Sequence, residues 1–266
     1  MDPWNPEEYL KFKSERTRPA EELLHRVQLT NVGRVVDLGC GPGNSTEILH
    51  RRWPKAEILG VDRSEAMIAK ARNSFPREAW VVADLADFQP PWPCDLVYAN
   101  ASLHWLKDHH LLIPSWMQKI RPGGALAFQI PSSEIPLVRK AIEAVSRESR
   151  WSDRMEIARN SLTLHPAPFY YQLLAPLASH LDIWETRYHH PMTNHQAILD
   201  WMGSTGMRPY LDALSDVRDQ QSFTKEVQKR VQDDYPLQPD GMVLFPFQRL
   251  FVIAYRCQEK TGLGEA

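Results

Sequence analysis

The sequence predicts an α/β fold in which a mostly parallel, seven-stranded sheet is flanked by helices. Three observations lead to this prediction. Short apolar runs alternate with helical patterns through the first half of the chain, glycines or acidic residues directly follow several of these runs, and two further strand-like runs occur late. Such alternation implies right-handed crossovers and helices on both faces of the sheet. Ligands of these sheets bind beyond the carboxyl ends of the strands, where we therefore expect the functional residues.

The first five strands and the helices between them follow from these patterns. The strands are expected at Arg34–Leu38, Glu57–Val61, Trp80–Ala83, Asp95–Ala99 and Ala125–Ile130. The helices are expected at Asn44–Trp53, at Ser64–Asn73, where Ser64 is a typical N-cap, and at His109–Lys119. Arg121–Gly124 contains a Pro-Gly pair, so it is expected to form a tight turn before the fifth strand.

The second half of the chain has a more helical pattern. Ser132–Pro176 is expected to be mostly helical, and further helices are expected at Asn194–Met202 and Asp216–Asp233. Ile183–His189 and Leu250–Tyr255 have the β-branched and aromatic composition of strands. We expect these two runs to complete the same sheet and the helices around them to cover its binding edge.

Composition excludes several classes of function. The 266 residues contain 31 Lys and Arg against 33 Asp and Glu, a net charge of −2, so no basic surface favours nucleic acid or an acidic membrane. The three cysteines, Cys40, Cys94 and Cys257, form neither a disulfide framework nor a metal-ligand spacing, and no metal site is predicted. Neither a signal peptide nor a membrane-spanning apolar run is visible. We therefore expect a cytoplasmic protein.

The most informative motif is Asp37-Leu38-Gly39-Cys40-Gly41-Pro42-Gly43, directly after the first strand. Its glycines permit a tight turn and close approach of a ligand to the backbone, ahead of a helix N-terminus. The dinucleotide pattern G-x-G-x-x-G would require glycine at Asn44 or Thr46. The pattern D-x-G-x-G-x-G instead resembles the first motif of class I methyltransferases. That resemblance implies a Rossmann-like fold whose glycine turn packs against the methionine part of S-adenosylmethionine.

Polar side chains also follow the next three predicted strands. Asp62 is placed to accept two hydrogen bonds from a ribose diol, which NAD and S-adenosylmethionine share, so this residue alone does not choose between them. The methyltransferase resemblance implies that Asp84 bonds the adenine amino group. Met67 is expected either to contact the adenine or to belong to the core. The predicted cofactor site comprises Asp37, Leu38, Gly39, Cys40, Gly41, Asn44, Asp62, Arg63, Met67, Asp84, Leu85, Asn100 and Ala101.

Beyond these motifs, the chain resembles the trans-aconitate methyltransferase family from end to end. The resemblance is carried by Tyr9–Phe12, Glu15–Ala20, Asp37–Glu47, Tyr98–Ala101, His190–Met192, Trp201, Thr205–Leu211 and Arg249–Phe251. It implies methyl transfer from S-adenosylmethionine to a carboxylate of trans-aconitate, a small tricarboxylate, with the monomethyl ester and S-adenosylhomocysteine as products. The charge balance predicts no nucleic-acid or membrane partner, and no obligate protein partner is evident from the sequence.

The implied substrate fits the available side chains. A carboxylate with a pKa near 4 is ionised at neutral pH, so it needs no general base and no catalytic residue is expected beyond those that position the reactants. The forked donors of an arginine match a carboxylate bidentately. The alternative for each candidate arginine is that it is a solvated surface charge or part of an ion pair. The predicted substrate residues are Tyr9, Arg16, Arg18, Trp105, Arg208, Tyr210 and Arg249. We expect Arg208→Ala to weaken tricarboxylate turnover.

The sequence is also compatible with other functions. A hydroxyl acceptor would require a base, and His104 would then serve as one; otherwise His104 lies in the pocket wall. Another small acid would use the same cofactor site. A non-catalytic S-adenosylmethionine-binding protein would retain the motifs without turnover, whereas the glycine spacing disfavours an NAD-dependent dehydrogenase.

The chain is expected to form a single domain over residues 1–266. Within it we expect an N-terminal helical cap segment (1–30), a cofactor-binding core (31–131), helical substrate-cap insertions (132–181 and 194–240) and two closing strands (182–192 and 243–257).

Overall fold

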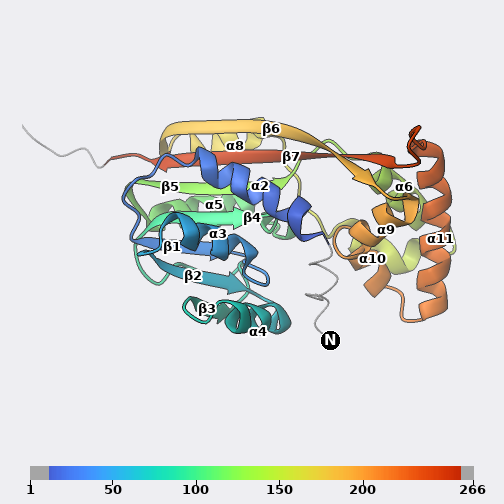
Figure 1. Cartoon of the computed structure of the whole chain (residues 1–266), viewed down its shortest axis with the longest axis horizontal. Coiled ribbons are helices and arrows are strands. Elements are labelled where there is room, and N and C mark those ends of the chain that lie inside the picture. The colour runs from blue at the N-terminus through green and yellow to red at the C-terminus, as the bar shows by residue number, and fades with distance from the viewer. Residues whose placement is uncertain (1–11, 259–266) are drawn as a thin grey trace, which may run out of the picture.

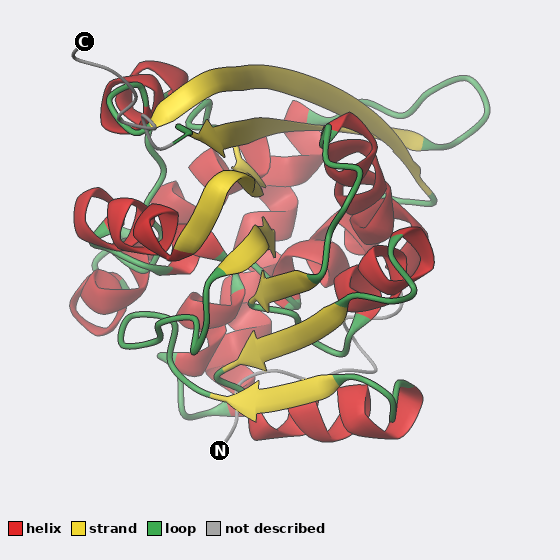
Figure 2. Ribbon diagram, turned by 90° about the vertical axis from the view of Figure 1, so that its left-hand side faces the viewer, coloured by secondary structure: helices red, strands yellow, loops and turns green. Residues whose placement is uncertain are grey.

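The computed structural model describes residues 12–258, which form one seven-stranded sheet and the helices around it. The strand order is β3-β2-β1-β4-β5-β7-β6, as Figure 2 shows end-on. Neighbours among the first five strands are parallel, and β7 runs antiparallel to both β5 and β6. The strands are β1 (Arg34–Leu38), β2 (Glu57–Asp62), β3 (Ala79–Val82), β4 (Cys94–Asn100), β5 (Ile120–Pro131), β6 (Ala178–Met192) and β7 (Val243–Arg256). The predicted fold is confirmed.

Helices cover both faces of the sheet. Successive strand residues point to opposite faces, so in β1 the side chain of Val35 packs with α2 and α3, while that of Val36 packs with α5 and α8. This burial on both faces explains why the adjacent residues Val35 and Val36 are both apolar. The helices of the sheet layers are α2 (Lys13–Arg26), α3 (Asn44–Arg52), α4 (Glu65–Ser74), α5 (His109–Lys119) and α8 (Ala167–Leu174).

The two last strands extend beyond the sheet and carry a helical cap. β5 ends where Pro131 pairs with Arg249, but β6 and β7 remain paired as far as Met192 and Val243. The resulting ribbon reaches the cap at one end of the molecule (Figure 1). The cap helices have a core of their own, which includes Trp151. They are α6 (Leu137–Ser146), α7 (Glu156–Arg159), α9 (His195–Gly203), α10 (Arg208–Asp212) and α11 (Val217–Asp234), with the 3₁₀ turn η2 (Ser152–Met155).

Most helix and strand boundaries predicted from local sequence patterns agree with the structure to within one residue. Ser64 caps α4 by accepting a hydrogen bond from the Met67 N–H at 3.1 Å, as its residue type predicts. The predicted turn Arg121–Gly124 lies instead within β5. There the pairing with β4 shifts from Cys94–Ile120 to Leu96–Ala125, so the turn residues form an irregular bulge.

The N-terminal helix is more than a cap. The Tyr98 hydroxyl on β4 donates a 2.6 Å hydrogen bond to the Ala20 carbonyl of α2, and the middle of this helix packs on the sheet. Only its start reaches the helical cap, where Phe12 contacts Trp201 with ring centroids 5.0 Å apart. No helix within residues 12–258 combines the length and the apolar character needed to cross a membrane.

Candidate active site

The glycine turn between β1 and α3 is held against β2. Gly39 has a φ of 72° and donates a 2.7 Å hydrogen bond to the Val61 carbonyl. A Cβ on Gly39 would lie 2.2 Å from Cβ of Ser102, so a side chain has no room there. The Gly41 N–H donates to the Asp62 carboxylate at 2.9 Å, which fixes the turn and the acid relative to each other.

Asp37 supports this turn from below rather than lining a cavity. One oxygen of its fully buried carboxylate accepts hydrogen bonds from the Ser45 and Thr46 hydroxyls, both at 2.7 Å. The other oxygen has no hydrogen-bond partner among residues 12–258. Burial outweighs the two hydrogen bonds and raises the pKa of Asp37 to about 6. Leu38 is likewise buried, and its carbonyl accepts a 2.6 Å bond from Ser102.

The strand ends enclose a first cavity of about 690 Å³, called here the nucleoside cavity. The ends of β1, β2, β3 and β4 contribute to it, because these four parallel strands are neighbours in the sheet. Its lining includes the predicted residues Gly39, Gly41, Asp62, Arg63, Met67, Asp84, Leu85, Asn100 and Ala101, together with Pro42, Ser102, Trp105 and Leu106. The acid at the end of β2 and the acid beyond β3 thus line one cavity, as a ribose diol and an adenine amino group require.

A smaller recess of about 330 Å³ adjoins the nucleoside cavity and shares Gly39, Gly41, Pro42 and Asn100 with it. The predicted residues Cys40 and Asn44 line the recess, as do Arg16 and Thr17 of α2. Three buried polar atoms here have no hydrogen-bond partner within residues 12–258: Asn44 Nδ2, Asn100 Oδ1 and Thr17 Oγ1. An amide donor, an amide acceptor and a hydroxyl beside a guanidinium fit the carboxylate and ammonium of an amino acid. This recess therefore suits the methionine end of S-adenosylmethionine.

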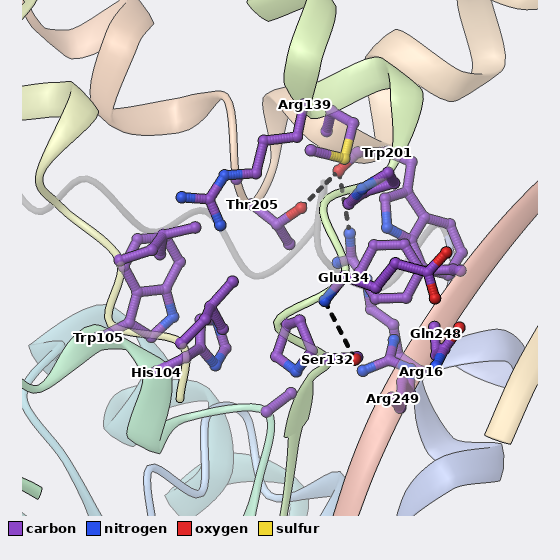
Figure 3. A pocket seen from close by; sticks show the side chains of 18 residues that line it. Arg16, His104, Trp105, Ser132, Glu134, Arg139, Trp201, Thr205, Gln248 and Arg249 are labelled. Carbon is purple, nitrogen blue, oxygen red and sulfur yellow. Dashed lines mark hydrogen bonds between the residues drawn. The ribbon is translucent and has the colours of Figure 1, made fainter. Parts of the chain in front are cut away.

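A third cavity of about 890 Å³, called here the arginine cavity, lies between the sheet edge and the cap (Figure 3). It shares Ala101 and Trp105 with the nucleoside cavity and Arg16 with the recess. The predicted residues Arg16, His104, Trp105 and Arg249 line it. Further lining residues that the sequence analysis missed include Ser132, Glu134, Arg139, Thr205 and Gln248.

Two nearly buried arginines form the sheet side of this cavity. Arg16 Nη2 donates to Ser204 Oγ at 2.8 Å, and its guanidinium lies 5.3 Å from the Trp201 ring centroid. Arg249 Nη1 donates to Gln129 Oε1 at 3.2 Å. Both residues are only 5% exposed. Charges removed from water to this extent interact strongly with anions, which makes both residues suitable carboxylate ligands.

Arg139 of α6 is the third guanidinium of the cavity. Its Nε donates to Glu143 Oε1 at 3.0 Å, one helical turn along. In the sequence this pair has the spacing of an ordinary surface ion pair on a helix, so nothing marked Arg139 as a site residue. Only the tertiary packing of α6 brings the Arg139 side chain to the cavity.

Three predicted substrate residues do not line this cavity. The Arg18 side chain is 65% exposed and pairs with Glu22 at 2.9 Å. Arg208 Nε lies 2.8 Å from an Asp212 oxygen within α10, outside the cavity lining. Tyr210 is buried in the cap core, where it stacks on Phe223. Tyr9 lies outside the described residues. The segment around Arg208 and Tyr210 thus builds the cap.

His104 lies in the cavity wall as a neutral side chain. Burial, followed by the charges of Arg249, His109 and Arg139, lowers its pKa to about 3. Its Nδ1 is buried without a hydrogen-bond partner among residues 12–258. A histidine with so low a pKa is a weak base at neutral pH, but it remains a hydrogen-bonding group.

Within residues 12–258, no group of three or more His, Cys, Asp or Glu side chains is placed to hold a metal ion. Burial raises the pKa of the Cys40 and Cys94 thiols, which accordingly act as small apolar side chains.

Comparisons with known proteins agree with this geometry. A family model described as "Methyltransferase domain" matches residues 35–124. The solved YcgJ protein of Bacillus subtilis has the same fold, with a TM-score of 0.58 and 11% identity, over 91% of this chain and 99% of that one. So does phosphoethanolamine N-methyltransferase 2 of Haemonchus contortus, solved with S-adenosylhomocysteine, with a TM-score of 0.55 and 15% identity, over 91% of this chain and 53% of that one. Fold and site define a class I S-adenosylmethionine-dependent methyltransferase.

The chain belongs to the trans-aconitate 2-methyltransferase family. It is 45% identical over 258 residues to the trans-aconitate 2-methyltransferase of Escherichia coli, an alignment that covers 97% of this chain and 100% of the relative. Both the family resemblance and S-adenosylmethionine as the cofactor are thereby confirmed.

Proposed function

We propose that this chain transfers the methyl group of S-adenosylmethionine to a carboxylate of trans-aconitate. The observation that carries the proposal is the shared wall between the two large cavities. Ala101 and Trp105 line both the nucleoside cavity and the arginine cavity, so a ligand in one meets a ligand in the other at these residues. The names of the curated relatives support the choice of acceptor.

The cofactor-binding roles follow from the residues at the strand ends. Asp62, already oriented by the Gly41 N–H, accepts hydrogen bonds from the ribose, and Asp84 accepts one from the adenine amino group. Asn44, Asn100 and Thr17 satisfy their unpaired polar atoms on the amino-acid end. When bound, S-adenosylmethionine supplies an electrophilic methyl group, whose transfer to a carboxylate oxygen leaves S-adenosylhomocysteine and the methyl ester.

The chain's own residues act on the acceptor by positioning it. The acceptor carboxylate is already ionised at neutral pH, and His104 with a pKa of about 3 is poorly suited to remove a proton. Arg16, Arg139 and Arg249 attract and orient the anionic substrate. Trp105 and Trp201 contribute apolar wall that excludes water, and fixed alignment of the two reactants supplies the rate enhancement. The proposal includes no nucleic acid, membrane or obligate protein partner.

A direct assay tests this function. The protein is incubated with methyl-labelled S-adenosylmethionine and, separately, trans-aconitate, cis-aconitate, citrate or isocitrate, and products are identified by mass spectrometry. We expect a base-labile monomethyl ester, formed fastest from trans-aconitate. Methylation of a hydroxyl group, or turnover of none of the four acids, would refute the proposal.

A further inference from the structure

The arginine cavity carries its positive charge on two different walls. Arg16 and Arg249 belong to α2 and β7, which pack in or on the sheet, whereas Arg139 belongs to α6 of the cap. Figure 3 shows the Arg139 side chain descending from the cap toward the part of the cavity above Trp105 and His104. Its charge also lowers the pKa of His104, in keeping with this position.

The hydrogen bonding of Arg139 leaves its ligand-binding edge available. Glu143 occupies Nε at 3.0 Å, and no other hydrogen bond from this side chain to a residue within 12–258 is present. The two terminal amino groups, which form the fork that fits a carboxylate, are therefore unoccupied by the described part of the chain. The side chain is only 16% exposed, so the Glu143 contact holds this fork in one direction inside a partly desolvated site.

The three arginines do not have equivalent surroundings. Arg16 also lines the recess suited to the methionine end, so its charge is shared with the cofactor's carboxylate. Arg249 and Arg139 then remain for two carboxylates of the acceptor. The third, reacting carboxylate has to stay free of a bidentate guanidinium, because pairing its charge weakens it as a nucleophile. Beside Ala101 and Trp105 it meets the neutral His104 instead.

We propose that Arg139 binds a carboxylate that is not methylated, and that it thereby makes the site selective for tricarboxylates over dicarboxylates. This inference rests on the proposed function for the identity of the acceptor. Arg139 is then a specificity residue contributed by the cap, and Glu143 is a positioning residue that aims it.

Three dicarboxylates, each lacking a different carboxyl group of trans-aconitate, test the assignment: itaconate, cis-glutaconate and mesaconate. Their affinities for the complex of the protein with S-adenosylhomocysteine are measured by calorimetry, beside that of trans-aconitate, in the wild type and in Arg139→Gln. We expect the substitution to weaken trans-aconitate about 10- to 100-fold, the usual effect of losing a charge-assisted pair. It should weaken two dicarboxylates similarly and leave the third, which lacks the carboxyl bound by Arg139, within about 2-fold.

Matched variants separate this role from general electrostatics and from folding. Arg147 lies at the end of the same helix, 3.8 Å from the same Glu143, but is 61% exposed, so Arg147→Gln should leave all four affinities unchanged. Arg139→Lys keeps the charge without the fork and should have an intermediate effect. The affinity for S-adenosylhomocysteine should not change in any variant.

Several outcomes would overturn the inference: equal weakening of all four acids, no weakening, or a parallel loss of S-adenosylhomocysteine affinity in both Arg139 variants. Should Arg139→Gln not fold, Arg139→Lys and Glu143→Gln have to give the same pattern at smaller amplitude. Because binding is measured without turnover, its result is distinct from that of the methylation assay. A protein that binds trans-aconitate through Arg139 but does not methylate it would refute only the proposed function.

Discussion

Arg208 and Arg249 have similar apolar and aromatic neighbours in the sequence but different positions in the structure. Arg249 lies in the middle of β7, where Gln129 holds it, and it faces the arginine cavity. Arg208 is paired with Asp212 on the short helix α10. Sequence neighbours do not reveal which way a side chain points once strands and helices pack, so only the fold separates the two residues.

The two arginines therefore make a matched pair for mutation. Arg249→Ala should lower kcat/KM for trans-aconitate by roughly 100-fold, because a charge-assisted contact contributes about 1.5–3 kcal/mol and Gln129 also loses its partner. Arg208→Ala, contrary to the expectation from sequence, should change kcat/KM by less than about 3-fold, within the range of an exposed ion pair. Steady-state kinetics measures both effects, and a larger loss in Arg208→Ala would place that residue in the site after all.

His104 gives a prediction about pH. Because its pKa of about 3 keeps it neutral from pH 6 to 9, the loss of kcat/KM in His104→Asn should be constant over this range. A loss that disappears as the pH rises would instead identify His104 as a general base, and with it a hydroxyl acceptor.

The same residue should make stability depend on pH. Its pKa is lower in the folded chain than its usual value of 6.5, so its contribution is fully present above pH 6.5 and is lost as the pH falls toward 3. Chemical denaturation should show that the free energy of unfolding of the wild type falls more steeply in this window than that of His104→Asn. Parallel curves for the two proteins would mean that His104 titrates normally.

At the scale of elements, the turn after β1 depends on glycine for two separate reasons. Gly39 combines a φ of 72° with a site where a Cβ would collide with Ser102. Gly241 has a similar φ of 81° in the distant cap, yet nothing lies within 4 Å of the Cβ position. The comparison separates the cost of the backbone conformation from the cost of the collision.

Gly39→Ala should therefore be more harmful than Gly241→Ala. Backbone strain alone costs about 1–2 kcal/mol, and overpacking adds about 1–3 kcal/mol at Gly39. Thermal denaturation should show a Tm fall in Gly39→Ala about twice that in Gly241→Ala, and calorimetry should show weaker binding of S-adenosylhomocysteine only in Gly39→Ala. Equal Tm shifts with unchanged binding would mean that the turn rearranges to accept a side chain.

At the scale of the whole molecule, the sheet and the cap have separate apolar cores joined by the β6–β7 ribbon and by the start of α2. The nucleoside cavity is formed by the sheet layers, but the arginine cavity is lined from both parts. Ligands of the two cavities should consequently stabilise different parts of the molecule.

Hydrogen exchange can detect this difference. S-adenosylhomocysteine alone should slow amide exchange in the turn after β1 and in α4. At a ligand concentration of 100 times its Kd, it should raise the free energy of unfolding by about 2.7 kcal/mol. Subsequent addition of trans-aconitate should slow exchange in α6 and α9 as well. If S-adenosylhomocysteine alone protects α6 and α9 fully, the cap closes on the cofactor rather than on the acceptor.

The sequence by itself determined the sheet and the cofactor end of the site. Gly39, Gly41, Asp62 and Asp84 directly follow predicted strands, and parallel strands bring their carboxyl ends to one edge. Such residues depend on local signals: a turn that only glycine permits, or a polar side chain at the end of an apolar run. Local chain geometry then suffices to place them.

The tertiary structure decided the arginine cavity, which is the proposed substrate end of the site. Arg16, Arg139 and Arg249 come from a helix of the sheet layer, a helix of the cap and a strand of the ribbon, and only packing between these elements brings them to one cavity. In the sequence, Arg139 and Glu143 have the spacing of a surface ion pair on a helix. The sequence predicts that Tyr210 binds the substrate, although it lies in the cap core. The physical reason is that the direction of a side chain depends on which face of its element is buried, and distant parts of the chain determine that face.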